Sequence, residues 1–103
     1  MAVYLIAEFD LTDPEAFEEY RPIVVPLLQK HGAEILAADY QPTFLEGDSR
    51  RACIVMRFGS ESAVMEFYND PAYQPSLKLR LACTANGSLA IAKEGYTPPP
   101  ETT

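Results

Sequence analysis

Two segments of the chain alternate apolar and mixed side chains with a period of two, and this alternation constrains the fold more than any other feature. One face of these segments is wholly apolar: Val3, Leu5, Ala7 and Phe9 in the first, and Ala52, Ile54, Met56 and Phe58 in the second. Alternation of this kind is typical of strands that pack one face on a core. The opposite faces carry Tyr4, Ile6, Cys53 and Val55, a set too apolar to be left in water.

The segment TDPEAFEEYRPIVVPLLQKHG is expected to form a helix. Asp13 suits the N-cap and Pro14 the first helical position, while Gly32 supplies the stop. The apolar stripe consists of Phe17, Tyr20, Val24 and either Leu27 or Leu28. Because Pro22 and Pro26 each remove an amide donor, we expect either one kinked helix or two short helices that meet near Arg21.

The remaining elements follow from turn and cap signals. We expect a strand from about residue 33 to 40, a turn at residues 46–49, and a helix capped by Ser60. The pair Asp70-Pro71 is expected to restart this helix and to carry it through residue 86, before a last strand over residues 87–95.

The order strand, helix, strand, strand, helix, strand predicts an α+β fold, the ferredoxin-like βαββαβ arrangement. Its sheet would have four antiparallel strands with the helices on one face. A chain of 103 residues suffices for one core. We assign residues 1–95 to this domain and residues 96–103 to a proline-rich tail, mobile or packed on a neighbour.

The sheet face that the helices leave uncovered predicts a second copy of the chain. Tyr4, Ile6, Cys53 and Val55 would be buried if two copies packed face to face. We therefore expect a homodimer with a shared interface, a dimeric α/β barrel.

Charge and composition narrow the classes of partner. Eight Lys and Arg face fifteen Asp and Glu, and the formal net charge of −7 argues against nucleic acid and against anionic lipid. No apolar run approaches the roughly 20 residues of a membrane span, and the first residues lack the basic and apolar regions of a signal peptide. We expect a cytoplasmic protein in which Cys53 and Cys83 are buried thiols.

The stretch YNDPAYQPSLKLRLA, residues 68–82, holds the principal candidates for a site. On a helix that begins at Pro71, the same face would carry Tyr73, Leu77, Arg80, Leu81 and Thr84. In one interpretation Arg80 clamps a carboxylate or enolate, with Tyr68 and Tyr73 as hydrogen-bond donors. In the other, Arg80 pairs with Glu46 or Asp48 and the tyrosines belong to the edge of the core.

Two further residues are secondary candidates. His31 is either a general base or a cation at the C-terminal end of the helix dipole. Tyr20 either closes the pocket from the first helix or is a core tyrosine with a wet hydroxyl. A single histidine without a cysteine partner makes no convincing metal site. Nothing resembles a catalytic triad, a P-loop or a dinucleotide fingerprint, so we expect no metal and no cofactor.

The sequence resembles the family catalogued as domain of unknown function 1330 over residue 2 to about residue 93. The features that carry the resemblance are Asp13-Pro14 before an aromatic helix, Glu46-Gly47 at the turn, the run FYNDPAY and Arg80. The family is placed in the dimeric α/β-barrel superfamily, so the resemblance implies this fold and a dimer. The superfamily includes cofactor-free monooxygenases, isomerases, haem-dependent enzymes and stress-response proteins. A shared fold therefore does not assign the activity of any of these proteins to this chain.

Two functional hypotheses follow. In the first, a homodimer binds a small, partly apolar carbonyl or carboxylate compound between helices and sheet, with Arg80, Tyr68 and Tyr73 as polar contacts and Tyr20, His31 and Glu46 as further candidates. Chemistry there would be cofactor-free proton transfer or oxygenation, with Arg80 stabilising an oxyanion. In the second, the dimer is a non-catalytic structural, accessory or stress-linked module.

Overall fold

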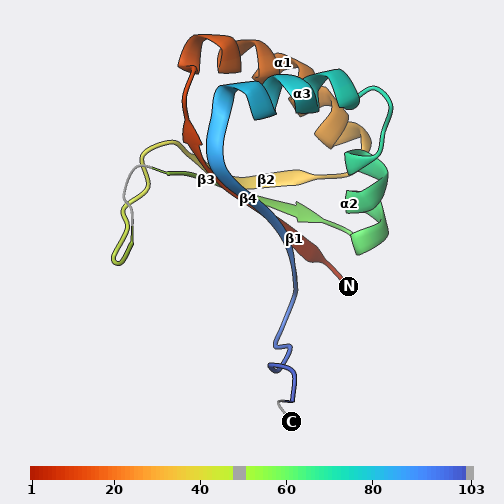
Figure 1. Cartoon of the computed structure of the whole chain (residues 1–103). Helices are drawn as coiled ribbons and strands as arrows, with labels where there is room; N and C mark the ends of the chain where they lie inside the picture. Colours follow the sequence, from red (N-terminus) through yellow and green to blue (C-terminus); the bar gives the residue numbers. More distant parts are fainter. Residues whose placement is uncertain (48–50, 102–103) are drawn as a thin grey trace.

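The computed structural model describes residues 1–47 and 51–101, and its elements follow the expected order (Figure 1). The elements are β1 (Val3–Leu11), α1 (Pro14–Lys30), β2 (Glu34–Asp39), β3 (Ala52–Phe58), α2 (Glu61–Tyr68), α3 (Gln74–Cys83) and β4 (Thr84–Lys93). The four strands form one antiparallel sheet in the order β2-β3-β1-β4. The α+β ferredoxin-like fold is thus confirmed, with the second helical segment divided into α2 and α3.

The two alternating segments pair with each other at the centre of the sheet. Leu5 on β1 lies opposite Met56 on β3 and opposite Ile91 on β4. Their wholly apolar faces point toward the helices, and every member of that set is buried except Ile54, which is half-buried. The prediction of which residues face the core is therefore confirmed.

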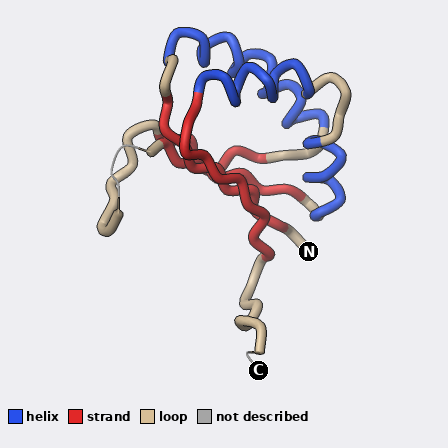
Figure 2. The backbone as a smooth tube through the Cα atoms, in the orientation of Figure 1, coloured by secondary structure: helices blue, strands red, loops and turns tan. Residues whose placement is uncertain are grey.

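The helices cover only one face of the sheet, as Figures 1 and 2 show. On the other face Ile6 lies between Val55 and Ala90, and Tyr4 is flanked by Ala92. Ile6, Tyr4 and Val55 are half-buried by their neighbours, and Ala90 and Ala92 are exposed. An apolar patch thus runs across three strands, and no helix or strand within residues 1–47 and 51–101 covers it.

Helix α1 is continuous through both prolines, so the alternative of two short helices is wrong. Asp13 caps it as expected, accepting a hydrogen bond from the amide of Ala16 at 3.2 Å. Pro22 and Pro26 are both exposed, so the carbonyls that lose their amide donors lie toward water. The buried stripe is the expected one: Phe17, Tyr20, Val24 and, of the two leucines, Leu28.

The expected start of the second helical stretch at Asp70-Pro71 is wrong. Asp70 instead closes a tight turn: its Oδ1 accepts from the amide of Ala72 at 2.9 Å, and its carbonyl accepts from the amide of Tyr73 at 2.8 Å. Helix α3 begins only at Gln74. The Asp-Pro pair is as compatible with a turn as with a helix start, because Asp accepts from amides two residues on in both.

The expected end of that helix is also wrong, because β4 begins at Thr84 rather than at Gly87. The carbonyl of Cys83 accepts from the amides of Thr12 and Asp13, which ties the end of α3 to the start of α1. Thr84 therefore belongs to a strand, although its hydroxyl donates to the carbonyl of Arg80 at 2.8 Å. Leu81, expected on the buried face, is 60% exposed.

Residues 94–101 form no helix or strand, and in Figure 1 they extend away from the sheet. The boundary between domain and tail at residue 95 stays a prediction. Among the residues that the structure describes, no helix is both long and apolar enough to span a bilayer.

Phe58→Ala tests the assignment of the core. Phe58 is fully buried (0% exposed), and its ring packs at a tilt against that of Phe67, with 5.9 Å between the ring centres. Removing its ring should lower the free energy of unfolding by about 3–5 kcal/mol. Leu81→Ala, at an exposed position, should change it by less than about 0.5 kcal/mol. Urea unfolding at equal protein concentration measures both, and similar losses in the two variants would contradict the assignment.

Candidate functional site

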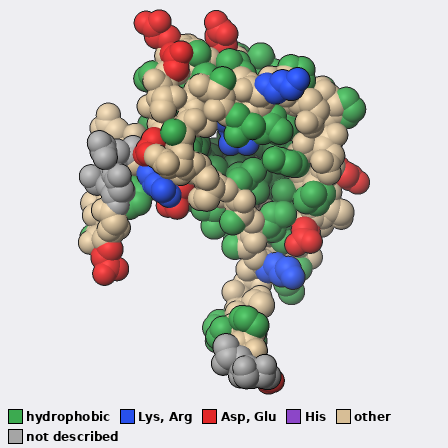
Figure 3. Space-filling view, viewed as in Figure 1, with side chains coloured by type: hydrophobic (Ala, Val, Ile, Leu, Met, Phe, Trp, Pro, Cys, Tyr) green, Lys and Arg blue, Asp and Glu red, His purple; other side chains and the backbone are tan. Residues whose placement is uncertain are grey.

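A cavity of about 350 Å³ lies between the helices and the sheet. In Figure 3 hydrophobic side chains surround a hollow that holds a Lys or Arg side chain. The walls are mostly apolar side chains from α1, the sheet and Phe67, and two alanines, Ala7 and Ala38, contribute short side chains that leave volume open. The cavity volume falls within the roughly 300–1,000 Å³ of small-molecule sites.

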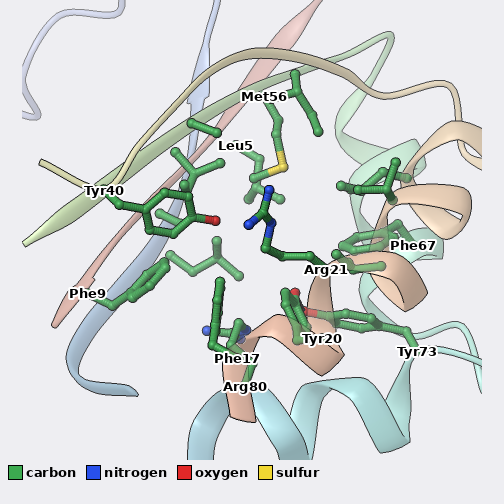
Figure 4. Close-up of a pocket in the computed structure, with 18 residues that line it drawn as sticks. Leu5, Phe9, Phe17, Tyr20, Arg21, Tyr40, Met56, Phe67, Tyr73 and Arg80 are labelled. Atoms are coloured by element: carbon green, nitrogen blue, oxygen red, sulfur yellow. Dashed lines mark hydrogen bonds between the residues drawn. The ribbon is translucent and has the colours of Figure 1, made fainter. Parts of the chain in front are cut away.

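Two tyrosines from different helices meet in the cavity wall. The hydroxyls of Tyr20 on α1 and Tyr73, just before α3, are 3.0 Å apart, and Figure 4 shows them side by side. Burial, and then the neighbouring Tyr73, raise the pKa of Tyr20 well above its ordinary range. Tyr20 therefore stays protonated, and only one of the two hydroxyl hydrogens is used in the mutual bond. The other is not used in this bond.

Arg80 lines the cavity from α3. Its Nε is buried and has no hydrogen-bond partner within residues 1–47 and 51–101. The positive charge of Arg80 also acts on Tyr20, whose pKa it pulls downward against the larger effect of burial. Arg80 and the tyrosine pair thus form a polar region in a largely apolar cavity.

Of the two carboxylates expected to pair with Arg80, the structure describes only one. Glu46 is exposed, does not line the cavity, and forms no ion pair with Arg80 in the part of the chain that the structure describes. Asp48, the other expected partner, lies outside the described residues. Glu46 is thus not placed where a ligand in the cavity would touch it.

Tyr68 lies outside the cavity and packs against Tyr73. Its ring lies 6.2 Å from that of Tyr73, and Tyr68 is half-buried but is not among the residues that line the cavity. The expected direct contact of Tyr68 with a ligand has no geometric support. Tyr68 contacts the back of Tyr73 instead.

His31 lies outside the cavity and contacts Asp70. Its Nε2 is 2.8 Å from Oδ2 of Asp70, which also accepts from Lys30 Nζ at 3.0 Å. The hydrogen bond from His31, then the amide of Ala72 and Lys30, hold the pKa of Asp70 well below its usual range. Because an ionised carboxylate only accepts, Nε2 of His31 is the donor. His31 therefore joins the end of α1 to the turn before α3, a role that the sequence did not indicate.

The sequence analysis missed two residues at the mouth of the cavity, Arg21 and Tyr40. The Arg21 guanidinium carbon lies 5.9 Å from the centre of the Tyr40 ring, and its Nη1 pairs with Glu18 at 3.0 Å. Burial raises the pKa of Tyr40. One signal for Arg21 was present: it lies four residues after Phe17 and three before Val24, within the arc of the buried stripe.

In the part of the chain that the structure describes, the cavity is lined by hydrogen-bond donors and cations but by no carboxylate, imidazole or thiol that could act as a general base. Among the described residues that line it there is no Asp, Glu, His or Cys, whereas Arg21, Arg80 and three tyrosines contribute polar groups. Elsewhere in residues 1–47 and 51–101, no three His, Cys, Asp or Glu side chains are grouped as metal ligands would be.

These features define an α+β protein with a ferredoxin-like fold and a largely apolar cavity between its helices and its sheet. The family model described as domain of unknown function (DUF1330) matches residues 2–94, and the chain belongs to this family. A search of curated proteins finds no significant match.

Several solved structures share the fold at low sequence identity. A protein of unknown function, RPA0582 from Rhodopseudomonas palustris, is 17% identical with a TM-score of 0.76, over 94% of this chain and 84% of the other. SnoaB, a cofactor-independent oxygenase from Streptomyces nogalater, is 13% identical with a TM-score of 0.68, over 96% and 98%. A dimeric protein of unknown function with a ferredoxin-like fold from Bacteroides fragilis is 13% identical with a TM-score of 0.62, over 89% and 95%.

Asp70→Asn tests the junction between α1 and the turn before α3. A carboxylate whose folded pKa is lowered stabilises the fold above its unfolded pKa, and this contribution is lost as the pH falls toward the folded value. We expect Asp70→Asn to be less stable than wild type at pH 7. The difference should shrink below about pH 4, where the unfolded Asp takes up its proton. Urea unfolding at pH 7, 4 and 3 measures this difference, and a gap that widens in acid would contradict the assignment.

Proposed function

We propose that the protein binds a small, partly apolar molecule bearing a carboxylate or enolate in the cavity between helices and sheet. The observation that carries the proposal is the pairing of an apolar cavity of about 350 Å³ with one polar region, formed by Arg80 and the Tyr20–Tyr73 pair. Arg80 would supply the charge and the free tyrosine hydroxyl a second donor. The apolar walls would bury the rest of the molecule.

The chemistry of the lining residues favours a ligand that brings its own negative charge. Donors and cations without a general base suit the binding of an anion better than the removal of a proton. If the site also catalyses a reaction, Arg80 and the tyrosine hydroxyl would stabilise negative charge that develops on a substrate oxygen. The structural likeness to a cofactor-independent oxygenase is compatible with such chemistry.

A homodimer formed through the uncovered sheet face is the second part of the proposal. No helix or strand of the described residues covers the patch around Ile6 and Val55, and burying it against a second copy would remove apolar surface from water. One structural neighbour is described as dimeric. The cavity lies on the other face of the sheet, so each protomer would keep its own.

Arg80→Leu is the central test of ligand binding. A thermal-shift screen against small carboxylates, lactones, phenols and short aldehydes should raise the melting temperature of wild type. At about 100 times the dissociation constant, binding adds roughly 2.7 kcal/mol, which is several degrees for a chain of this size. We expect the shift to disappear in Arg80→Leu and to persist in Lys78→Leu, which removes an exposed cation from the same helix.

Tyr20→Phe and Tyr73→Phe keep the test decisive if Arg80→Leu does not fold. Each keeps the ring and removes one hydroxyl of the pair, so each should weaken binding while the fold is retained. If no compound class stabilises wild type, the binding proposal is wrong. A protein that still dimerises would then fit the non-catalytic module.

Ile6→Glu tests the interface. A charge at the centre of the uncovered patch should convert a dimer to monomers in sedimentation velocity at micromolar concentration, because an unpaired charge is costly to bury. Glu66→Gln, at an exposed position on α2, should leave the dimer intact. A monomeric wild type would contradict this part of the proposal.

A further inference from the structure

Arg21 lies where the cavity opens to solvent. It lines the cavity and also a shallow groove on the outside of α1, together with Glu18, Pro22 and Val25. Its side chain is 52% exposed. In Figure 4 the Arg21 guanidinium extends among the lining side chains toward Met56, whereas that of Arg80 lies on the side of Phe17 and Tyr20. Arg21 is therefore the more exposed of the two cations, whereas Nε of Arg80 is buried.

The distribution of charge around the cavity is unusual for this chain. The whole protein has a formal net charge of −7, with eight Lys and Arg in total. Two of these eight line one cavity, and none of the lining residues in the described part of the chain is acidic. The cavity thus combines two cations with an apolar interior, which is the complement of a molecule with two anionic groups on an apolar body.

The two arginines differ in their surroundings. Arg21 pairs with Glu18, three residues earlier on the same helix, and both side chains are more than half exposed. Exposed pairs of this kind are weak, typically about 0–1 kcal/mol, so a ligand can compete for the guanidinium. Tyr40 holds that guanidinium at the mouth, since its ring lies 5.9 Å from the guanidinium carbon and packs edge-on against Phe17.

We propose that Arg21 is a specificity-determining residue that binds a second anionic group, so that the cavity prefers dianionic ligands, such as dicarboxylates, over monoanions. This inference rests on the binding function proposed above and names its ligand class. Arg80 and the tyrosine pair bind one anionic end of the ligand, and the apolar walls contact its body. Arg21 releases its ion pair with Glu18 and binds the second anionic end instead. Glu18 is then the competitor that sets how strongly the second end is bound.

Matched probe pairs of equal length test this proposal by calorimetry at low salt: hexanoate against hexanedioate, and 4-methylbenzoate against terephthalate. Wild type should bind each dianion more tightly than its monoanion. In Arg21→Gln the dianion affinity should fall about three- to tenfold, the range for one charge-assisted bond at a partly exposed site, and monoanion affinity should not change. Lys78→Gln removes an exposed cation elsewhere and should alter neither.

Glu18→Gln gives a result of opposite sign, which a purely structural role of the ion pair would not produce. Freeing Arg21 from its competitor should raise dianion affinity by about twofold or more, and Glu19→Gln, which removes an equal exposed charge next to it, should raise it less. If wild type does not prefer dianions, or Arg21→Gln weakens both probes of a pair equally, this inference is wrong while Arg80-dependent binding of monoanions stands. If neither kind of probe binds wild type, the proposed function and this inference both fail.

Discussion

The hydrogen bond between Tyr20 and Tyr73 joins α1 to the start of α3 above the sheet, and both tyrosines line the cavity. The rings around it form a continuous aromatic layer, with Phe17 at 5.2 Å from Tyr20 and Phe67 at 4.5 Å from Tyr73. Large flat side chains keep the helices apart from the short side chains of Ala7 and Ala38 on the sheet. Aliphatic side chains would have let the helices settle closer, because cores pack to near-crystalline density wherever the shapes allow it.

A second junction fixes the other end of α1. Asp70 accepts from Lys30 and His31 at the helix terminus and from the amide of Ala72 in its own turn, and it is only 9% exposed. Removing this carboxylate would release both the end of α1 and the turn that places Tyr73. The position of Tyr73 in the cavity wall thus depends on the contacts that Asp70 makes in the turn before α3. These contacts require the Asp70 carboxylate to be ionised.

The features predictable from sequence are those with local causes. The alternation of apolar and mixed side chains predicted the buried faces of β1 and β3. The capping residues Asp13 and Ser60 predicted where α1 and α2 begin. The limits of α3 were not predictable, because its start depends on a carboxylate that Lys30 and His31 hold from another helix. Its end depends on the carbonyl of Cys83, which accepts from amides seventy residues earlier in the chain. Three of the cavity's polar residues, Arg80, Tyr73 and Tyr20, were named from sequence. Arg21, which directly precedes Pro22, and Tyr40 were not.

The whole chain is acidic and its cavity is lined by cations, and this contrast bears on how the proposed anionic ligand would be selected. A net charge of −7 repels an anion at long range, so the approach of such a ligand gains no help from steering. Affinity must then come from short-range contacts inside the cavity, where water is displaced and a guanidinium acts more strongly than it does in bulk solvent. This arrangement disfavours small, fully hydrated anions, which gain little from apolar walls. It favours molecules whose apolar body fills the space between the aromatic layer and the sheet while their charged groups reach the arginines.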